Sequence, residues 1–168
     1  MAVRVVGPLQ WIAYPTLITI AATIILATPV KLFGLTLPEP VLPMVLAFSW
    51  PLIRPSVVAP VVLLGLGLLV DSFWSGPFGM WGLALSAVYG VVLLSRSFLL
   101  GQEVRVLFVW YTACTLMAFL LAYVVVTIGS PTAPSLLATI AQIVPTLLVF
   151  PLAHIMIERF DDGDVRFR

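Results

Sequence analysis

The chain has 168 residues, of which 62% are hydrophobic and only 9% are charged, whereas about a quarter of an average soluble domain is charged. A soluble core of this length cannot hide so much apolar surface, so the composition excludes a soluble domain and predicts one integral membrane domain over residues 1–168. The net charge of +1, the absence of a basic run and the single Cys114 give no basis for nucleic-acid binding, a disulfide framework or a thiolate metal site.

Apolar segments follow one another along the chain, and a helix needs about 20 residues to cross a hydrocarbon layer of roughly 30 Å. The first segment, residues 9–30, lacks a cleavage pattern and is interpreted as a retained span. Residues 56–74 and 78–95 are shorter, and each crosses where the bilayer is thin or the helix stands upright. Residues 107–128 and 136–157 are long enough by themselves, and Pro145 and Pro151 predict a kink in the latter.

The remaining segment, residues 35–53, leaves the number of spans open. Pro38, Pro40 and Pro43 remove backbone donors at its start, so only residues 44–53 are an uninterrupted helix candidate. The segment either crosses the membrane or forms a re-entrant element buried against protein, where its free carbonyls find partners. We therefore expect an all-α, polytopic bundle of six membrane helices, with five helices plus a re-entrant segment as the alternative.

Arginine is distributed unevenly over the expected loops. With six spans, seven arginines share one side of the membrane: Arg4, Arg54, Arg96, Arg105, Arg159, Arg166 and Arg168. Only Lys31 then faces the other side, and with five spans it changes places with Arg4. Because Lys and Arg accumulate in cytoplasmic loops, both arrangements place Arg54, the 97–105 loop and the C-terminus in the cytoplasm, and Asp71 toward the outer side. We expect a multi-pass protein of the cytoplasmic membrane with both termini inside.

Small residues recur every four positions in the fourth expected span. Gly82, Ser86 and Gly90 form one smooth helix face, and Gly79 lies one turn before them. Such a face lets another backbone approach closely. The face packs either against a helix of the same chain or against another protein.

Two charged residues are candidates for a function in the bilayer. Asp71 follows a long apolar run, and an acid at that depth is costly, so it is a functional-site candidate. Alternatively, the helix ends there and Asp71 is wetted by headgroups or caps the turn at residues 75–79. Arg54, which lies between Pro51 and Pro55, is expected to anchor the chain to headgroup phosphates.

Nothing in the sequence predicts catalysis, a cofactor or a metal site. His154 is the only histidine, and Glu158 follows at i+4, but a metal site needs three or four ligands. Gln142 is interpreted as a hydrogen-bonding group between helices. No nucleophile elbow, phosphate loop or pair of intramembrane carboxylates occurs, so only Asp71 and His154 leave room for an intramembrane enzyme.

One stretch of the chain carries a family resemblance. After the run WPLIRP at residues 50–55 come Gly67, Asp71, Gly76, Pro77 and Gly79, which lead into the glycine-containing span. In this motif, and in its length and number of spans, the chain resembles the MreD family of bacterial rod shape-determining membrane proteins. The resemblance in length and number of spans covers nearly the whole chain, whereas the motif covers only a local part of it.

The resemblance implies a non-catalytic scaffold of the cell-elongation complex, which supports peptidoglycan synthesis and cell shape. Its expected partners are MreC, a single-span protein, and the RodA–penicillin-binding-protein complex, alongside the MreB cytoskeleton. It implies a six-helix fold similar to the substrate-binding components of energy-coupling-factor vitamin transporters. It does not indicate which of Asp71, Gly76, Gly79 and the following small residues touches a partner.

The shared fold keeps open a second hypothesis, a substrate-binding subunit of a small-molecule, vitamin-type transporter. Such subunits couple to their motor through small residues at i and i+4 on the first helix. Here Ala21 is followed by Ile25 and Ala22 by Leu26, so that face is missing.

Overall fold

The computed structural model describes residues 4–6, 9–26, 31–32, 35–36, 38–74, 76–129, 135–161 and 165–167. Its helices are η1, a π-helix (Leu9–Ala13), α1 (Tyr14–Leu26), α2 (Pro43–Ile53), α3 (Val58–Trp74), α4 (Met80–Leu94), α5 (Arg96–Leu99), α6 (Val104–Gly129), α7 (Leu136–Leu148) and α8 (Phe150–Asp161). Two short strand pairs complete it: β1 (Arg4–Val6) parallel to β4 (Val165–Phe167), and β2 (Lys31–Leu32) antiparallel to β3 (Leu35–Thr36). The prediction of a helical protein is confirmed.

Two helices in the described part of the chain are long and apolar enough to cross a membrane. They are Val104–Gly129, which is α6, and Leu136–Phe160, which takes in α7 and most of α8. The 26 residues of α6 correspond to a length of about 39 Å. Four shorter apolar helices of 10–17 residues accompany them: Trp11–Leu26, Pro43–Ile53, Val58–Trp74 and Met80–Leu94.

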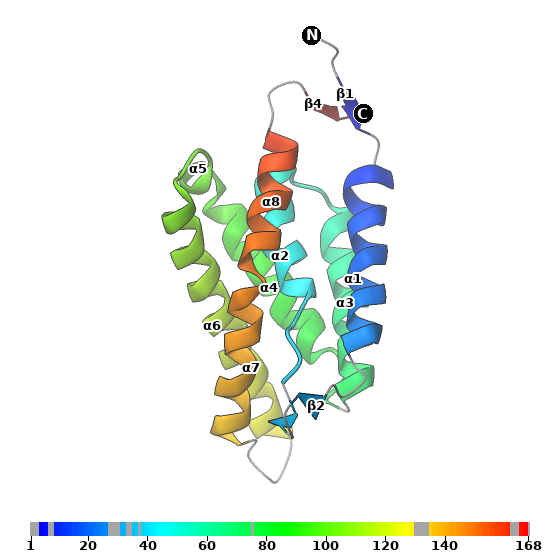
Figure 1. Ribbon diagram of the computed structural model, residues 1–168, viewed down its shortest axis with the longest axis vertical. Coiled ribbons are helices and arrows are strands. Elements are labelled where there is room, and N and C mark those ends of the chain that lie inside the picture. The colour runs from blue at the N-terminus through cyan, green and yellow to red at the C-terminus, as the bar shows by residue number, and fades with distance from the viewer. Residues whose placement is uncertain are drawn as a thin grey trace.

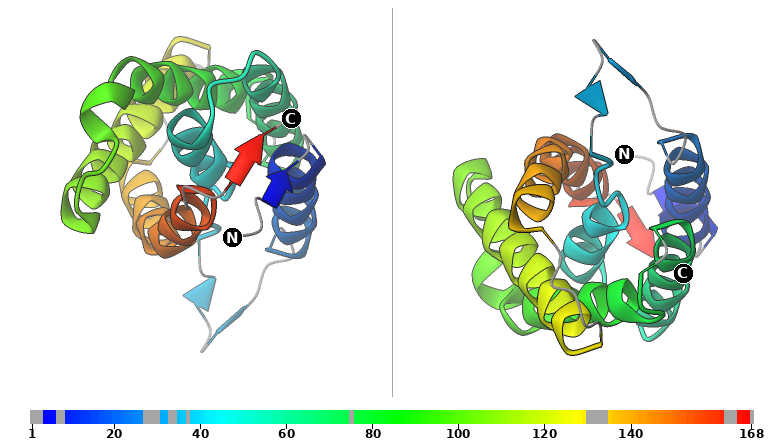
Figure 2. Two further views of the ribbon diagram at one scale, coloured as in Figure 1. Left: turned by 90° about the horizontal axis from the view of Figure 1, so that it is seen from above. Right: turned by 90° about the horizontal axis from the view of Figure 1, so that it is seen from below.

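The helices run along the long axis of the molecule and enclose α2 (Figures 1 and 2). The chain passes from one end to the other in α1, in residues 38–53, in α3, in α4, in α6 and in the α7–α8 pair (Figure 1). As a result, β1 and β4 lie side by side at the end that carries α5, and β2 and β3 lie at the opposite end (Figure 1). We call the first of these the α5 end.

Helix α2 forms the centre of the bundle. All of its residues except Ile53 are buried, and it contacts α1, α3, α4, α5, α6 and α8. Its ring of apolar side chains has no polar face, which is typical of a helix surrounded by protein. Phe48 meets the ring of Tyr111 edge-on at 5.3 Å, and the Trp50 indole nitrogen donates to the Trp11 carbonyl oxygen at 3.1 Å.

The proline-rich start of this pass, residues 38–42, is non-helical backbone that bonds to α7, and we call it the extended segment. The Val41 amide donates to Thr146 Oγ1 at 3.1 Å, and Gln142 Nε2 donates to the Glu39 carbonyl oxygen at 3.2 Å. The helix begins at Pro43, one residue before the predicted start, because a proline at a helix start has no donor to lose. Residues 38–53 run between the two ends of the bundle and do not return to the end at which they enter (Figure 1).

The last pass is broken rather than continuous. Helix α7 ends at Leu148 and α8 begins at Phe150, close to Pro151, which cannot donate to a preceding turn. The helical pattern is therefore interrupted at Val149, beside Pro151, whereas Pro145, the other proline at which a kink is predicted, lies inside α7. Within the expected 97–105 loop, by contrast, residues 97–99 belong to the short helix α5 and residues 104–105 to α6, so that the loop prediction was wrong over these positions.

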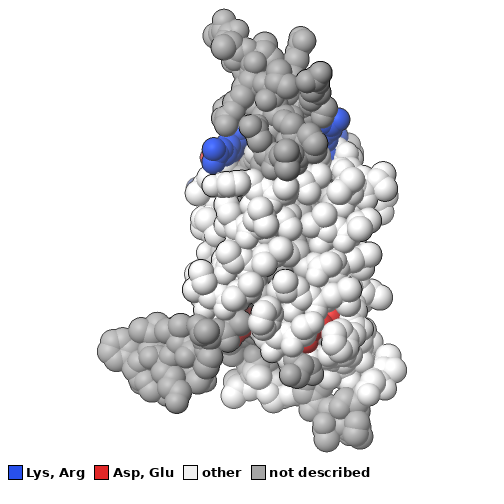
Figure 3. All heavy atoms as spheres, turned by 90° about the vertical axis from the view of Figure 1, so that its right-hand side faces the viewer, with Lys and Arg blue, Asp and Glu red and all other residues white. Residues whose placement is uncertain are grey.

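The exterior is apolar between the two ends. Large hydrophobic side chains are exposed on every long helix of the bundle wall, for example Ile18, Val61, Leu83, Val109, Leu120, Val144 and Leu152. Among the described side chains on the face drawn in Figure 3, those of Lys and Arg lie at the α5 end. A band without charged side chains separates them from Asp and Glu nearer the other end (Figure 3).

Candidate functional site

Asp71 lies near the end of α3 and caps the next helix. It is only 1% exposed. Its Oδ2 accepts from the Gly79 amide at 2.8 Å, and its Oδ1 accepts from the Trp81 amide at 3.2 Å. The Gly79 amide belongs to the N-cap of α4 and the Trp81 amide to its first turn, and Gly79 has no side chain that could satisfy them. Asp71 lies on the preceding helix and therefore supplies the hydrogen-bond acceptors that the N-cap side chain of α4 would usually supply.

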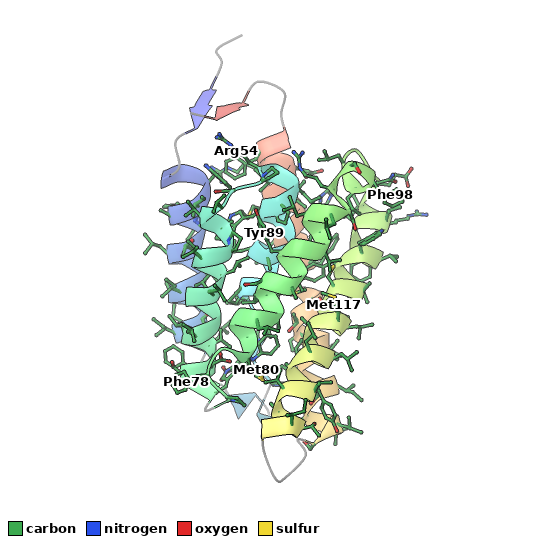
Figure 4. The ribbon with its side chains drawn as sticks, turned by 180° about the vertical axis from the view of Figure 1, so that it is seen from behind. Arg54, Phe78, Met80, Tyr89, Phe98 and Met117 are labelled. Atoms are coloured by element: carbon green, nitrogen blue, oxygen red, sulfur yellow. The ribbon has the colours of Figure 1, made fainter. Side chains whose placement is uncertain are left out.

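The turn between α3 and α4 is shaped to allow this contact. Gly79 has φ +90°, in the left-handed region that glycine adopts without strain. The Gly76 amide donates to the Asp71 carbonyl oxygen at 3.3 Å. Pro77 lies between these glycines. The labels of Phe78 and Met80 in Figure 4 show that the turn lies at the end of the bundle opposite Arg54. Of the two interpretations of Asp71, the geometry matches the cap of the turn.

Gly82 packs against a helix of the same chain. A Cβ added at Gly67 of α3 would overlap the backbone nitrogen and Cα of Gly82, so the two helices touch backbone to backbone at this point. A Cβ at Gly82 would in turn lie 3.3 Å from the Leu64 carbonyl oxygen. The sequence pattern singled out Gly82, but it did not identify Gly67 as its partner, because spacing within one helix carries no information on the register of the next.

Ser86 and Gly90 differ from Gly82 in their surroundings. Both are partly exposed, and a Cβ at Gly90 would meet no atom within 4 Å. The Ser86 hydroxyl donates to the Gly82 carbonyl oxygen of its own helix at 2.8 Å. The described chain thus leaves space open at Gly90 and leaves Ser86 partly exposed.

Arg54 ends α2 at the α5 end of the bundle (Figure 4). The turn after it is tied to α4 by Tyr89, whose hydroxyl accepts from the Ser56 amide at 3.0 Å and donates to the Ser56 carbonyl oxygen at 2.9 Å. Arg54 and Asp71 are at opposite ends of α3, as expected from the sequence. The sequence pattern did not indicate Tyr89, because a single tyrosine in an apolar span resembles any core aromatic residue.

A partly buried polar cluster connects α3, α6, α7 and the extended segment. The Tyr111 hydroxyl donates to the Thr146 carbonyl oxygen at 3.1 Å, just before the α7–α8 break. Thr146 Oγ1 donates to the Gln142 carbonyl oxygen at 2.9 Å, and the Trp74 indole nitrogen donates to Glu39 Oε2 at 2.8 Å. Gln142 was predicted to hydrogen-bond to another helix, whereas its partner, the Glu39 carbonyl oxygen, belongs to the non-helical residues before α2. Each hydrogen bond of this cluster joins two groups of the chain itself.

His154 and Glu158 are adjacent on α8, with His154 Nε2 3.4 Å from Glu158 Oε1. The His154 ring stacks on Phe150 at a centroid distance of 6.2 Å. Among the described residues, no three His, Cys, Asp or Glu side chains lie close enough to hold a metal ion.

Comparison with known proteins adds no assignment: no protein-family model, no curated protein and no solved structure matches this chain.

Proposed function

We propose that the chain is a multi-pass protein of the bacterial cytoplasmic membrane in which all six passes cross the bilayer. The exposed apolar band and the extended segment, whose polar groups are satisfied within the bundle, support this arrangement. Because the described arginines that follow α2, start α5 and lie near the end of α8 share one end, that end is cytoplasmic. The C-terminus follows α8 and is cytoplasmic as well.

Within that membrane, we propose a non-catalytic scaffold of the rod-shape type, similar to MreD. It binds an MreC-like single-span protein and supports peptidoglycan synthesis by the RodA–penicillin-binding-protein complex. The observation that carries this proposal is that Gly67, Asp71, Gly76 and Gly79, which bear the resemblance, form one unit that joins α3 to α4. That unit fixes the orientation of the helix whose open face carries Ser86 and Gly90.

The partner-binding surface in this proposal is the open part of α4. In lipid, helices associate through close packing of small residues because burying apolar surface brings little gain. Ser86 and Gly90 offer such a surface at the exterior, whereas Gly82 is already occupied by α3.

A catalytic role is not proposed. Both carboxylate oxygens of Asp71 accept from backbone amides. His154 lines a hollow beside α5, at the opposite end of the bundle. The transporter-subunit alternative is not favoured either, since Ile18 and Ile25 are exposed on the outer surface of α1, where small coupling residues would be expected.

Co-purification tests the scaffold proposal. We expect the wild-type chain to co-purify in mild detergent with the MreC-like protein of its own organism, and Gly90→Leu to reduce recovery about ten-fold by blocking close approach. Gly65→Leu is the matched control, because Gly65 is an exposed glycine of α3 at which a Cβ also meets no atom within 4 Å. Failure of the wild-type chain to co-purify would count against the scaffold, and equal loss in both variants would count against the α4 face.

A further inference from the structure

A hollow of about 320 Å³ opens at the α5 end, away from the Asp71 turn. Its walls come from the end of α2, from the α5–α6 connection and from α8. The floor is apolar and includes Leu52, Leu99 and Leu107, each of which is buried in the bundle. Of the polar interactions described above, only the contact between His154 and Glu158 lies at this hollow.

Among the described side chains at the rim of the hollow, Asp and Glu outnumber Lys and Arg, and one of the two glutamates, Glu158, also contacts His154. Glu103 and Glu158 are exposed and line it together with Gln102 and His154, and no Lys or Arg belongs to the part of the lining that the structure describes. His154 Nδ1 is buried and has no hydrogen-bond partner among the described residues. An otherwise basic end of the molecule therefore contains one acidic, apolar-floored recess.

We propose that this hollow receives a basic side chain from the cytoplasmic flank of a partner's membrane helix, an inference that rests on the membrane-scaffold function proposed above. The positive-inside rule gives single-span proteins Lys and Arg at that level of the bilayer. The stem of such a side chain is apolar and fits the leucine floor, while its charged head reaches the two glutamates at the rim. Charge complementarity of this kind selects the partner and its orientation.

A defined probe tests this. The chain, reconstituted in phosphatidylcholine nanodiscs, is titrated by energy transfer with a synthetic Leu/Ala helix of about 20 residues that carries lysines at one flank. A twin peptide carries glutamines there instead. We expect the lysine peptide to bind about ten-fold more tightly than its twin, and high salt to remove the preference.

The variant Glu103→Gln with Glu158→Gln should abolish the preference without affecting the twin. Because it also raises the net charge by two, the matched control is Ser97→Lys with Phe98→Lys, which adds two charges on exposed α5 positions outside the hollow. This control should keep most of the preference.

Three outcomes would overturn the inference: no preference in the wild-type chain, equal loss in both double variants, or loss when phosphatidylethanolamine replaces phosphatidylcholine. The last outcome would assign the hollow to a lipid ammonium group. Since the peptide contains no sequence from an MreC-like protein, its binding does not depend on the co-purification result. Conversely, the Glu103→Gln, Glu158→Gln variant could co-purify with the MreC-like protein as well as the wild type does. That result would leave the scaffold proposal intact and would show that the hollow is not part of the partner-binding surface.

Discussion

Asp71 illustrates how an expensive residue becomes part of the structure. A buried carboxylate is tolerated when backbone amides satisfy it, and the first turn of a helix supplies amides that lack partners. The Gly79 and Trp81 amides fill this role, and the positive end of the α4 dipole adds to the attraction. The same geometry explains why glycine is needed at position 79, where φ is +90°.

Replacing Asp71 should therefore lower stability. Asp71→Ala leaves two amides without acceptors and is expected to cost about 3 kcal/mol in free energy of unfolding. Asp71→Asn keeps one acceptor oxygen and should cost less. Denaturant unfolding in detergent measures both, with Ser72→Ala as the control, since the exposed Ser72 bonds only to the Leu68 carbonyl of its own helix. An alanine variant as stable as the wild type would show that the cap is unimportant.

At the scale of elements, the contact between α3 and α4 depends on one position. Gly67 lies against the Gly82 backbone, so these helices approach more closely than side chains on both would permit. Gly65, two residues earlier on α3, points to open space. The two glycines have the same propensity cost within a helix and differ in what a methyl group would meet.

Alanine substitution separates these roles. Gly67→Ala should push α3 from α4 and destabilise the bundle by about 1–3 kcal/mol, the range for overpacked sites. Gly65→Ala should be neutral or raise stability by up to about 1 kcal/mol, because alanine favours the helix. Thermal unfolding of the two variants in one detergent makes the comparison. Equal effects at both positions would mean that propensity, and not the contact, sets the change.

Local sequence signals predicted the ends of the helices well, whereas hydrogen-bond partners that lie far apart along the chain could not be predicted. The prolines placed the start of α2 within one residue and the α7–α8 break near Pro151, since a missing donor acts within its own turn. The acceptor for the Val41 amide, however, lies 105 positions away at Thr146. The sequence left open whether Asp71 caps the turn between α3 and α4. The cap forms only where α3 approaches α4 closely, and the sequence does not show how closely they approach.

At the scale of the whole molecule, one short helix organises the fold. Helix α2 is buried on all sides, and the longer helices form a wall around it (Figure 2). Its extended entry explains how an 11-residue helix belongs to a full pass of the bundle. The outward surface of the wall remains apolar, so the arrangement satisfies polar backbone inside and leaves hydrocarbon-compatible side chains outside.

Side-specific labelling tests the resulting topology. With Cys114 replaced by alanine, single cysteines at Ser97 and Ser135 should react with a membrane-impermeant maleimide from opposite sides, Ser97 only after the membrane is opened. Ser97 is exposed on α5, and Ser135 is the exposed N-cap of α7 at the other end of α6. Reporters fused to the two termini should both register as cytoplasmic, because six crossings return the chain to its starting side. A periplasmic N-terminus with a cytoplasmic C-terminus would instead require an odd number of crossings and would exclude the arrangement in which all six passes cross.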